Sequence, residues 1–184
     1  MNQKKFYELF PIYNKKVLEL GCGKEHPCTD LLRIHNKVTP TDVEKRNIKG
    51  FVKADVKKLP FPNNSFDVVF AGHVLHHLPN DLDKAVKEIK RVLKHNGKFY
   101  GEEPNGKWLY FWIVMARSNE KWNNNYTIEE KPLTPKIIKE IFNKNGFETD
   151  TEYIMERLPL IKDKLSFIKN RFSSCFVIKA SKKA

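Results

Sequence analysis

A short apolar run that ends in alternate glycines constrains this chain more than any other stretch. Residues 17–23 read VLELGCG. We expect a buried strand that breaks into a tight turn, because glycine lacks a Cβ and therefore tolerates positive φ and the close approach of a ligand. Alternate glycines fit a plain corner as well as a nucleotide-like binding loop. The residues that follow must decide between these two interpretations.

Length and composition predict one folded domain over residues 1–184, with 40% hydrophobic and 12% aromatic residues. No apolar run reaches the roughly 18 to 20 residues of a membrane span, and the N-terminus lacks the apolar core of a signal peptide, so we expect a cytoplasmic protein. Cys22, Cys28 and Cys175 are odd in number and lack CxxC spacing. This argues against a disulfide framework and a zinc site, and no metal is expected.

The net charge of +12 is unevenly distributed along the chain. Residues 157–184 contain eight Lys or Arg and a single Asp. Such a segment is either a solvated face or an attractor of an anionic partner. A nucleic-acid partner is compatible with this charge but is not favoured, because no RNA-binding pattern is present. The sequence gives no indication of the oligomeric state.

Strand-like and helix-like segments alternate, which predicts a doubly wound α/β sheet. Further strands are expected at 38–41, 51–54, 66–71, 98–101, 147–155 and 172–179, and helices at 29–36, 82–95 and 134–144. We expect Thr29 and Thr134 to cap the first and last of these helices, and Lys94 and His95 to occupy the last turn of the middle one. In such sheets, ligands bind outside the carboxyl ends of the strands.

Acidic residues gather at those predicted strand ends. Glu19, Asp42, Asp55 and Glu102 each follow or end a strand, and Ala71 ends another. Carboxylates are hydrogen-bond acceptors and repel phosphate. The arrangement therefore favours a neutral or cationic ligand.

The spacing of the glycines argues against a dinucleotide. Asp42 lies 21 positions beyond Gly21, where an acid that ends the second strand comes alongside a ribose. A dinucleotide loop needs a third small residue after Gly23, whereas this chain continues Lys24-Glu25-His26. A nucleoside without phosphates fits better.

Residues 17–105 resemble the class I S-adenosylmethionine-dependent methyltransferases, particularly the type 11 and ubiquinone/menaquinone-biosynthesis branches. The resemblance rests on four motifs in order: VLELGCG, TDVEK, KADVKKLPFPNNSFDVVFAGHVLHHL and EIKRVLKHNGKFYGEEPN. It implies a Rossmann-like seven-stranded sheet, mostly parallel with an antiparallel last strand, and S-adenosylmethionine as cofactor. Residues 1–105 would then be the cofactor-binding half and residues 106–184 the substrate-specificity half.

The same resemblance implies the residues that hold the cofactor. Glu19 and the glycine loop would hold the methionine part, Asp42 the ribose hydroxyls, and the Ala71 carbonyl the ammonium group. Asp55 would accept from the adenine amino group, with apolar neighbours beside the ring. The full set of implied positions is Glu19, Gly21, Cys22, Gly23, Asp42, Val43, Ala54, Asp55, Val56 and Ala71.

His73 and His76 are the candidate catalytic bases, followed by Glu102 and Glu103. A base is needed only if the acceptor is protonated, because methyl transfer is an in-line displacement that depends chiefly on positioning. Histidines in this motif also line the site or cap a helix in the family, and their spacing permits a metal site as another interpretation.

The acceptor is predicted to be a small molecule. Residues 108–115 read WLYFWIVM and predict a helix over the site, with a core helix, an apolar or aromatic acceptor pocket, and an interface as the interpretations. The predicted function is S-adenosylmethionine-dependent methyl transfer to that acceptor. Two alternatives remain: an RNA-modifying methyltransferase that uses the basic C-terminal segment, and a non-catalytic module that binds S-adenosylmethionine or S-adenosylhomocysteine.

Overall fold

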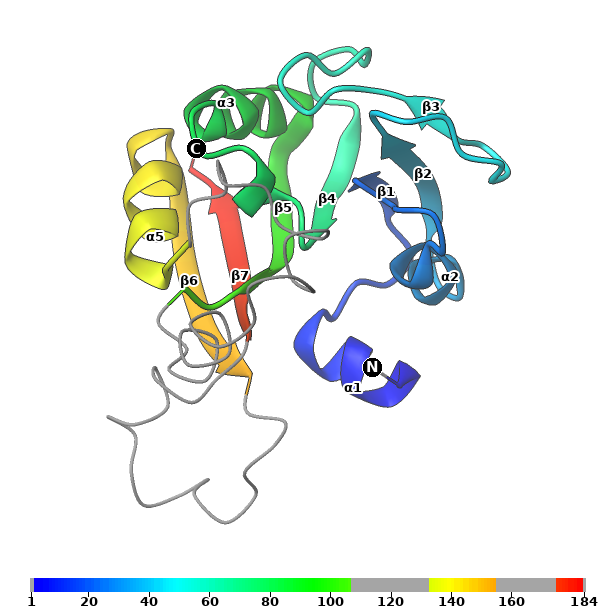
Figure 1. Ribbon diagram of the computed structural model, residues 1–184, viewed down its shortest axis with the longest axis horizontal. Coiled ribbons are helices and arrows are strands. Elements are labelled where there is room, and N and C mark those ends of the chain that lie inside the picture. The colour runs from blue at the N-terminus through cyan, green and yellow to red at the C-terminus, as the bar shows by residue number, and fades with distance from the viewer. Residues whose placement is uncertain (1, 107–132, 155–174, 184) are drawn as a thin grey trace, which may run out of the picture.

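The strands of the protein form one seven-stranded sheet in the order β3-β2-β1-β4-β5-β7-β6 (Figure 1). The computed structural model describes residues 2–106, 133–154 and 175–183. The predicted helix at 108–115 and the ends of the last two predicted strands, 155 and 172–174, therefore lie outside the described residues. The strands are β1 (Lys16–Leu20), β2 (Lys37–Asp42), β3 (Val52–Lys53), β4 (Phe66–Gly72), β5 (Leu93–Pro104), β6 (Phe147–Ile154) and β7 (Cys175–Lys182).

Strand directions confirm the predicted fold class. The pairs β1–β2, β2–β3, β1–β4 and β4–β5 are parallel. Strand β7 runs antiparallel to both of its neighbours, β5 and β6. The sheet is therefore a Rossmann-like, mostly parallel sheet whose last strand is antiparallel.

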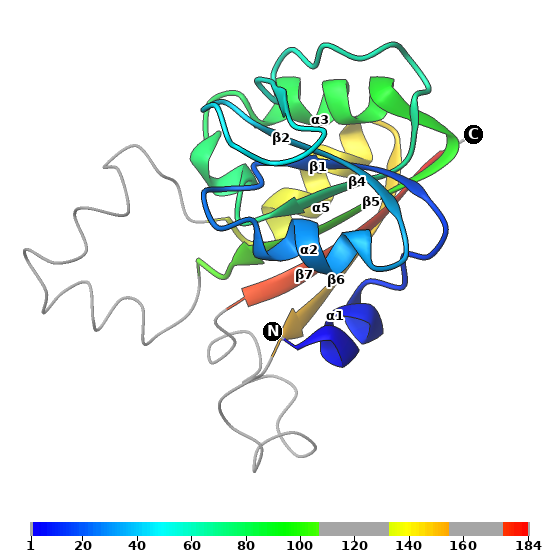
Figure 2. The same ribbon diagram turned by 90° about the vertical axis from the view of Figure 1, so that its right-hand side faces the viewer.

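Helices cover both faces of the sheet, with α3 on one side and α1 and α2 on the other (Figure 2). Val69 joins the core beneath α3 and α5, whereas Val68 packs with Phe6 and Phe10 from the α1 segment. Both valines are buried, as expected for a central strand that is covered on two faces. Among the described helices, none is long and apolar enough to cross a membrane. The helices are α1 (Gln3–Leu9), α2 (Pro27–Arg33), the 3-10 helix η1 (Leu75–His77), α3 (Leu82–Val92) and α5 (Pro135–Lys144).

The predicted boundary between α3 and β5 is wrong. The helix ends at Val92, so Lys94 and His95 belong to β5 instead of the last helical turn. Leu93 is buried and pairs with Phe66 on β4. An apolar residue at this position fits a helix face as well as a strand, so the hydrophobic pattern does not distinguish the two. In the strand, Lys94 forms a 2.7 Å ion pair with Asp67.

The boundaries of α5 follow the predicted signals. Thr134 is the N-cap, and its side chain accepts a hydrogen bond from the Ile137 backbone N–H. Pro135 occupies the first helical position, where its missing N–H has no cost. Gly146 follows the helix with φ of +80°, a conformation that favours glycine.

Candidate functional site

The glycine loop leaves β1 at the carboxyl edge of the sheet in a conformation that only glycine adopts readily. Gly21 and Gly23 have φ of +60° and +70°. The Cys22 N–H donates to the Thr41 carbonyl of β2 over 2.9 Å, which holds the loop against the neighbouring strand. A Cβ on Gly21 would lie 2.5 Å from Val74 Cγ2, whereas one on Gly23 would meet nothing within 4 Å. The outer glycine therefore leaves open space beside the loop.

Asp42 lies at the end of β2 and ties the glycine loop to the next turn. Its Oδ2 accepts from the Gly23 N–H over 3.0 Å, and its Oδ1 accepts from the Glu44 N–H over 2.9 Å. Arg46 Nη2 also lies 3.3 Å from Oδ1. The carboxylate is buried, so these donors compensate for its lost hydration. The predicted ribose acid and the glycine loop are thus neighbours in space.

Glu19 is almost fully buried at the end of β1, and burial raises its pKa to about 7. The hydroxyl of Thr29 donates to Glu19 Oε2 over 2.5 Å. The prediction that Thr29 caps its helix is wrong. Helix α2 begins at Pro27, with His26 as N-cap in the left-handed region. Thr29 is the third residue of the helix, and its side chain donates to the buried acid instead of capping the helix.

The segment after β3 brings apolar and acidic groups beside Asp42. The Ala54 N–H donates to the Asp42 carbonyl over 3.0 Å, and Ala54 and Val56 are buried. The side chain of Asp55 is 46% exposed and lies 3.6 Å from Lys57 Nζ. Val43 is a large apolar residue with 57% exposure. Apolar surface and an accessible carboxylate therefore lie next to the glycine loop.

Cys22 and Ala71 complete the set of predicted cofactor residues. Burial, with the nearby carboxylates of Glu19 and Asp42, raises the pKa of the Cys22 thiol to about 11. The thiol therefore stays protonated at neutral pH and is a poor nucleophile. Ala71 pairs with Leu20 of β1 and with Gly101 of β5. A Cβ at Gly101 would approach the Ala71 carbonyl oxygen to 3.1 Å.

His73 is a half-exposed histidine held in a strained backbone conformation just beyond β4. Its φ is +56°, which is uncommon for any residue other than glycine. Its N–H donates to the Glu102 carbonyl over 2.7 Å, and its Nε2 lies 3.6 Å from Glu102 Oε1. The nearby Glu102 carboxylate raises the pKa of His73 above its ordinary value. His73 is thus an accessible histidine with a carboxylate partner.

His76, the other candidate base, is buried and engaged with Glu103. Its Nδ1 lies 2.7 Å from Glu103 Oε2. The Glu103 carboxylate is fully buried and also accepts from the backbone N–H groups of Val74, Leu75 and His76. It therefore caps η1 from a neighbouring strand. The sequence offers no local signal for this role, because the partners are more than 25 residues apart in the chain.

His73 also belongs to a cluster of potential metal ligands. Potential ligand atoms of His73, Glu102 and Cys175 all lie within 4.8 Å of one another, the one such cluster in the part of the chain that the structure describes. Imidazole, carboxylate and thiolate are ligands that zinc accepts. The spacing of the cysteines does not predict this cluster, because Cys175 lies on the antiparallel strand β7, opposite Pro104 of β5.

Comparisons with known proteins identify the arrangement. A family described as "Methyltransferase domain" matches residues 18–101, from β1 through the glycine loop to β5. The chain carries a class I S-adenosylmethionine-dependent methyltransferase domain. Its fold is similar to that of a SAM-dependent methyltransferase from Archaeoglobus fulgidus, with a TM-score of 0.71, 20% identity, and coverage of 97% of this chain and 90% of that one.

The names of two relatives of this domain give different activities. A sterol 4-C-methyltransferase, strm-1, of Caenorhabditis elegans is 38% identical over 101 residues, which cover 47% of this chain and 30% of that protein. The mitochondrial arginine-hydroxylase NDUFAF5 of Rattus norvegicus is 33% identical over 157 residues, which cover 77% of this chain and 46% of that protein. The chain thus spans less than half the length of either relative.

Proposed function

We propose that the protein transfers a methyl group from S-adenosylmethionine to a small-molecule acceptor. The observation that carries this proposal is the contact between Asp42 and the glycine loop, with the buried Glu19 at the start of the same loop. These carboxylates lie at the carboxyl edge of the sheet, where ligands of such folds bind. Carboxylates suit the hydroxyl, amino and ammonium donors of this cofactor, and they would repel the phosphates of a dinucleotide.

Each described position suits one part of the cofactor. Asp42 would accept from the ribose hydroxyls, and the half-exposed Asp55 would accept from the adenine amino group between the apolar side chains of Val43 and Val56. Glu19 and the carbonyl of Ala71 would hold the methionine ammonium. The open space beside Gly23, where a Cβ would meet nothing within 4 Å, supports an approach of the ligand along the loop.

When bound, S-adenosylmethionine supplies an electrophilic methyl group on a positively charged sulfur. An O–H or N–H acceptor must lose a proton as it is methylated, and His73 is the group that would take it up. Its exposure and its Glu102 partner favour this role over His76, whose Nδ1 is held by the buried Glu103. The carboxylate of Glu102 would stabilise the imidazolium that forms.

The nature of the acceptor is the finer part of the proposal. We infer an apolar or aromatic small molecule, supported by the sterol named in one relative and by the composition of residues 108–115. We also infer a cytoplasmic location. It is supported by three cysteines that are all free, as is usual in a reducing compartment.

Titration calorimetry with S-adenosylmethionine tests the cofactor site. We expect the wild-type protein to bind, and Asp42→Ala to weaken binding at least about tenfold, because hydrogen bonds to charged groups contribute roughly 1.5–3 kcal/mol. Asp42→Asn is the matched control for shape and should lose less. No binding by the wild type, or undiminished binding by Asp42→Ala, would refute the assignment.

Transfer of a labelled methyl group tests the acceptor. The protein is incubated with methyl-labelled cofactor and a sterol-containing lipid extract, a polar metabolite extract, or total RNA. Label in an organic-soluble small molecule is the expected result. Label in RNA alone would contradict the proposed acceptor class, and His73→Ala should reduce transfer to an O–H or N–H acceptor by about 10²-fold or more.

A further inference from the structure

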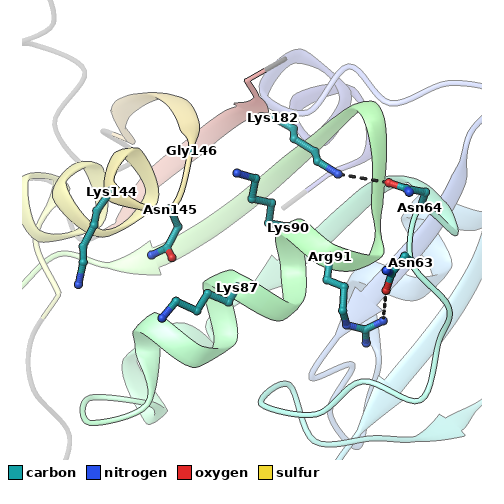
Figure 3. A pocket seen from close by; sticks show the side chains of 9 residues that line it. All are labelled: Asn63, Asn64, Lys87, Lys90, Arg91, Lys144, Asn145, Gly146 and Lys182. Carbon is teal, nitrogen blue, oxygen red and sulfur yellow. Dashed lines mark hydrogen bonds between the residues drawn. The ribbon is translucent and has the colours of Figure 1, made fainter.

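A basic cavity lies at the edge of the sheet opposite the glycine loop. Its volume is about 590 Å³, and it is bounded by α3, the end of α5, the end of β7 and the turn that precedes β4 (Figure 3). Asn63 and Asn64 come just before the first residue of β4, so the cavity lies at the amino end of that strand. It is therefore separate from the site described above. Five of its nine lining residues are cationic and none is acidic: Lys87, Lys90, Arg91, Lys144 and Lys182.

Three of these cations have partners within the protein. Arg91 makes a bidentate pair with Glu88, and its remaining donors reach Asn63 and the carbonyls of Leu59 and Phe61. The N–H donors of the guanidinium are thus all engaged within the protein, where they hold the turn that precedes β4. Another carboxylate is shared by two lysines, Lys87 at 2.7 Å and Lys144 at 3.5 Å from Asp83. The two acids leave the group of five cations with a net charge of +3.

The other two cations, Lys90 and Lys182, line the cavity, whose described lining residues include no acid. Within residues 2–106, 133–154 and 175–183, Lys90 makes no ion pair. Among the residues that the structure describes, Lys182 Nζ donates only to neutral oxygens, the Leu93 carbonyl at 2.9 Å and Asn64 Oδ1 at 3.3 Å. Burial and the charge of Lys90 both lower the pKa of Lys182. Two ammonium groups thus repel each other beside a cavity, an arrangement that a bound anion would relieve.

Helix ends explain only part of this cluster. Lysines in the last turn of a helix are favoured by the helix dipole, which accounts for Lys144 and contributes at Lys90. Lys182 lies on strand β7, so a helix dipole does not account for its position. The absence of a side chain at Gly146 leaves room for the Lys90 ammonium, because a Cβ on that glycine would lie 2.3 Å from Lys90 Nζ.

We propose that this cavity binds the phosphate groups of an anionic ligand through Lys90 and Lys182. Lysine binds phosphate as a compact point charge, and the asparagine amides at the rim add neutral polar groups. The volume is within the range of about 300–1,000 Å³ of small-molecule sites, but the lining lacks the aromatic and apolar groups of an uncharged ligand's site. A phosphorylated small molecule and the backbone of an RNA both present this chemistry.

Binding of pyrophosphate by calorimetry, and of a short labelled single-stranded RNA by fluorescence anisotropy, tests the proposal. The variant is Lys90→Gln with Lys182→Gln. The control, Lys4→Gln with Lys37→Gln, removes the same charge at exposed lysines of α1 and β2. We expect at least about tenfold weaker binding in the variant and less than twofold change in the control, because each charged hydrogen bond contributes roughly 1.5–3 kcal/mol. Lys90→Gln alone should weaken binding in the same direction with no loss of fold, since it breaks no ion pair among the described residues.

The two probes separate the sources of the phosphate. Binding of pyrophosphate alone indicates a phosphorylated small molecule. RNA binding indicates a nucleic-acid backbone if the slope of log affinity against log salt concentration is smaller in magnitude by about 1.4 in the double variant. Failure of the wild type to bind either probe, or undiminished binding by both lysine variants, overturns the proposal. S-adenosylmethionine affinity, measured on the same samples, should be unchanged, so this outcome is independent of the proposed function.

Discussion

The backbone N–H of Gly23 donates to Asp42 Oδ2 over 3.0 Å, so the loop after β1 is held by the acid that ends β2. The other oxygen of the same carboxylate accepts from Glu44 and lies near Arg46. The loop is therefore ordered by the protein itself. A ligand that binds there need not supply all of the free energy for ordering it.

The two glycines of the loop should differ in their tolerance of substitution. Both have positive φ, so an alanine at either position costs about 1–2 kcal/mol in backbone strain. Only at Gly21 does the new Cβ also meet Val74, at 2.5 Å from its Cγ2. Urea unfolding should therefore show a larger loss of stability for Gly21→Ala than for Gly23→Ala. Equal losses would mean that the Val74 contact is relieved without cost.

Stability should fall as pH rises from about 4.5 to 7 because of Glu19. Its pKa is raised to about 7 in the folded protein by burial, so the folded state binds a proton that the unfolded state has released in this range. The shift corresponds to roughly 3 kcal/mol lost by pH 8. Glu19→Gln mimics the protonated form, and it should flatten this part of the pH profile and increase stability at pH 8. An unchanged profile would show that Glu19 is not its source.

Cofactor binding should release a proton from Glu19. An ammonium group near the carboxylate lowers its pKa, so binding at pH 6.5 converts the protonated acid to the charged form. Calorimetry in two buffers with different ionisation enthalpies measures this release. We expect the observed enthalpy to depend on the buffer in the wild type and to lose most of that dependence in Glu19→Gln. Equal dependence in both proteins would place the ammonium elsewhere.

Glu102 should set the titration of His73. The Glu102 carboxylate raises the pKa of His73 above its ordinary value, so Glu102→Gln should lower it, as NMR titration of the imidazole can measure. A raised histidine pKa contributes stability below pH 6.5 that disappears as pH rises through the folded-state pKa. The contribution is small because the side chain is half exposed. A pKa that is unaffected by Glu102→Gln would contradict the pairing.

Removing the buried carboxylate of Glu103 should destabilise the fold severely. Glu103→Ala removes the carboxylate that accepts from three backbone N–H groups and contacts His76 Nδ1, at a cost of about 3 kcal/mol or more in the free energy of unfolding. Glu102→Gln, at the adjacent residue, should cost less than about 1 kcal/mol because its histidine partner is half exposed. Denaturant unfolding compares the two. A loss below 1 kcal/mol for Glu103→Ala would show that other donors replace the contact.

The sheet and its ligand-binding edge could be predicted because their signals are local. Buried residues such as Val68 and Val69 form an uninterrupted apolar run, and the residues that end parallel strands necessarily share one edge. The boundaries of helices and strands are harder to predict from the sequence. Leu93 is an example, because a leucine that is buried in either structure does not distinguish a helix end from a strand start. Thr29 illustrates the same limit, because a threonine that can cap a helix can equally serve a buried acid.

The side-chain partnerships of the site could not be predicted from the sequence. Glu102 and Glu103 are adjacent, yet one meets a half-exposed histidine and the other is fully buried, since neighbouring residues on a strand point to opposite faces. The approach of Cys175 to His73 depends on the register of β7, which is fixed by pairing over many residues. The convergence of Lys90 and Lys182 likewise depends on tertiary packing alone.

The position of β7 also bears on how the protein is made. This strand is the last of the seven described strands in sequence, yet it lies inside the sheet between β5 and β6. While the chain emerges from the ribosome, the edges of β5 and β6 have no partner until residues 175–182 appear. An unpaired strand edge is a template for aggregation. Pairing of residues 175–182 therefore covers one edge of β5 and one edge of β6 in a single step.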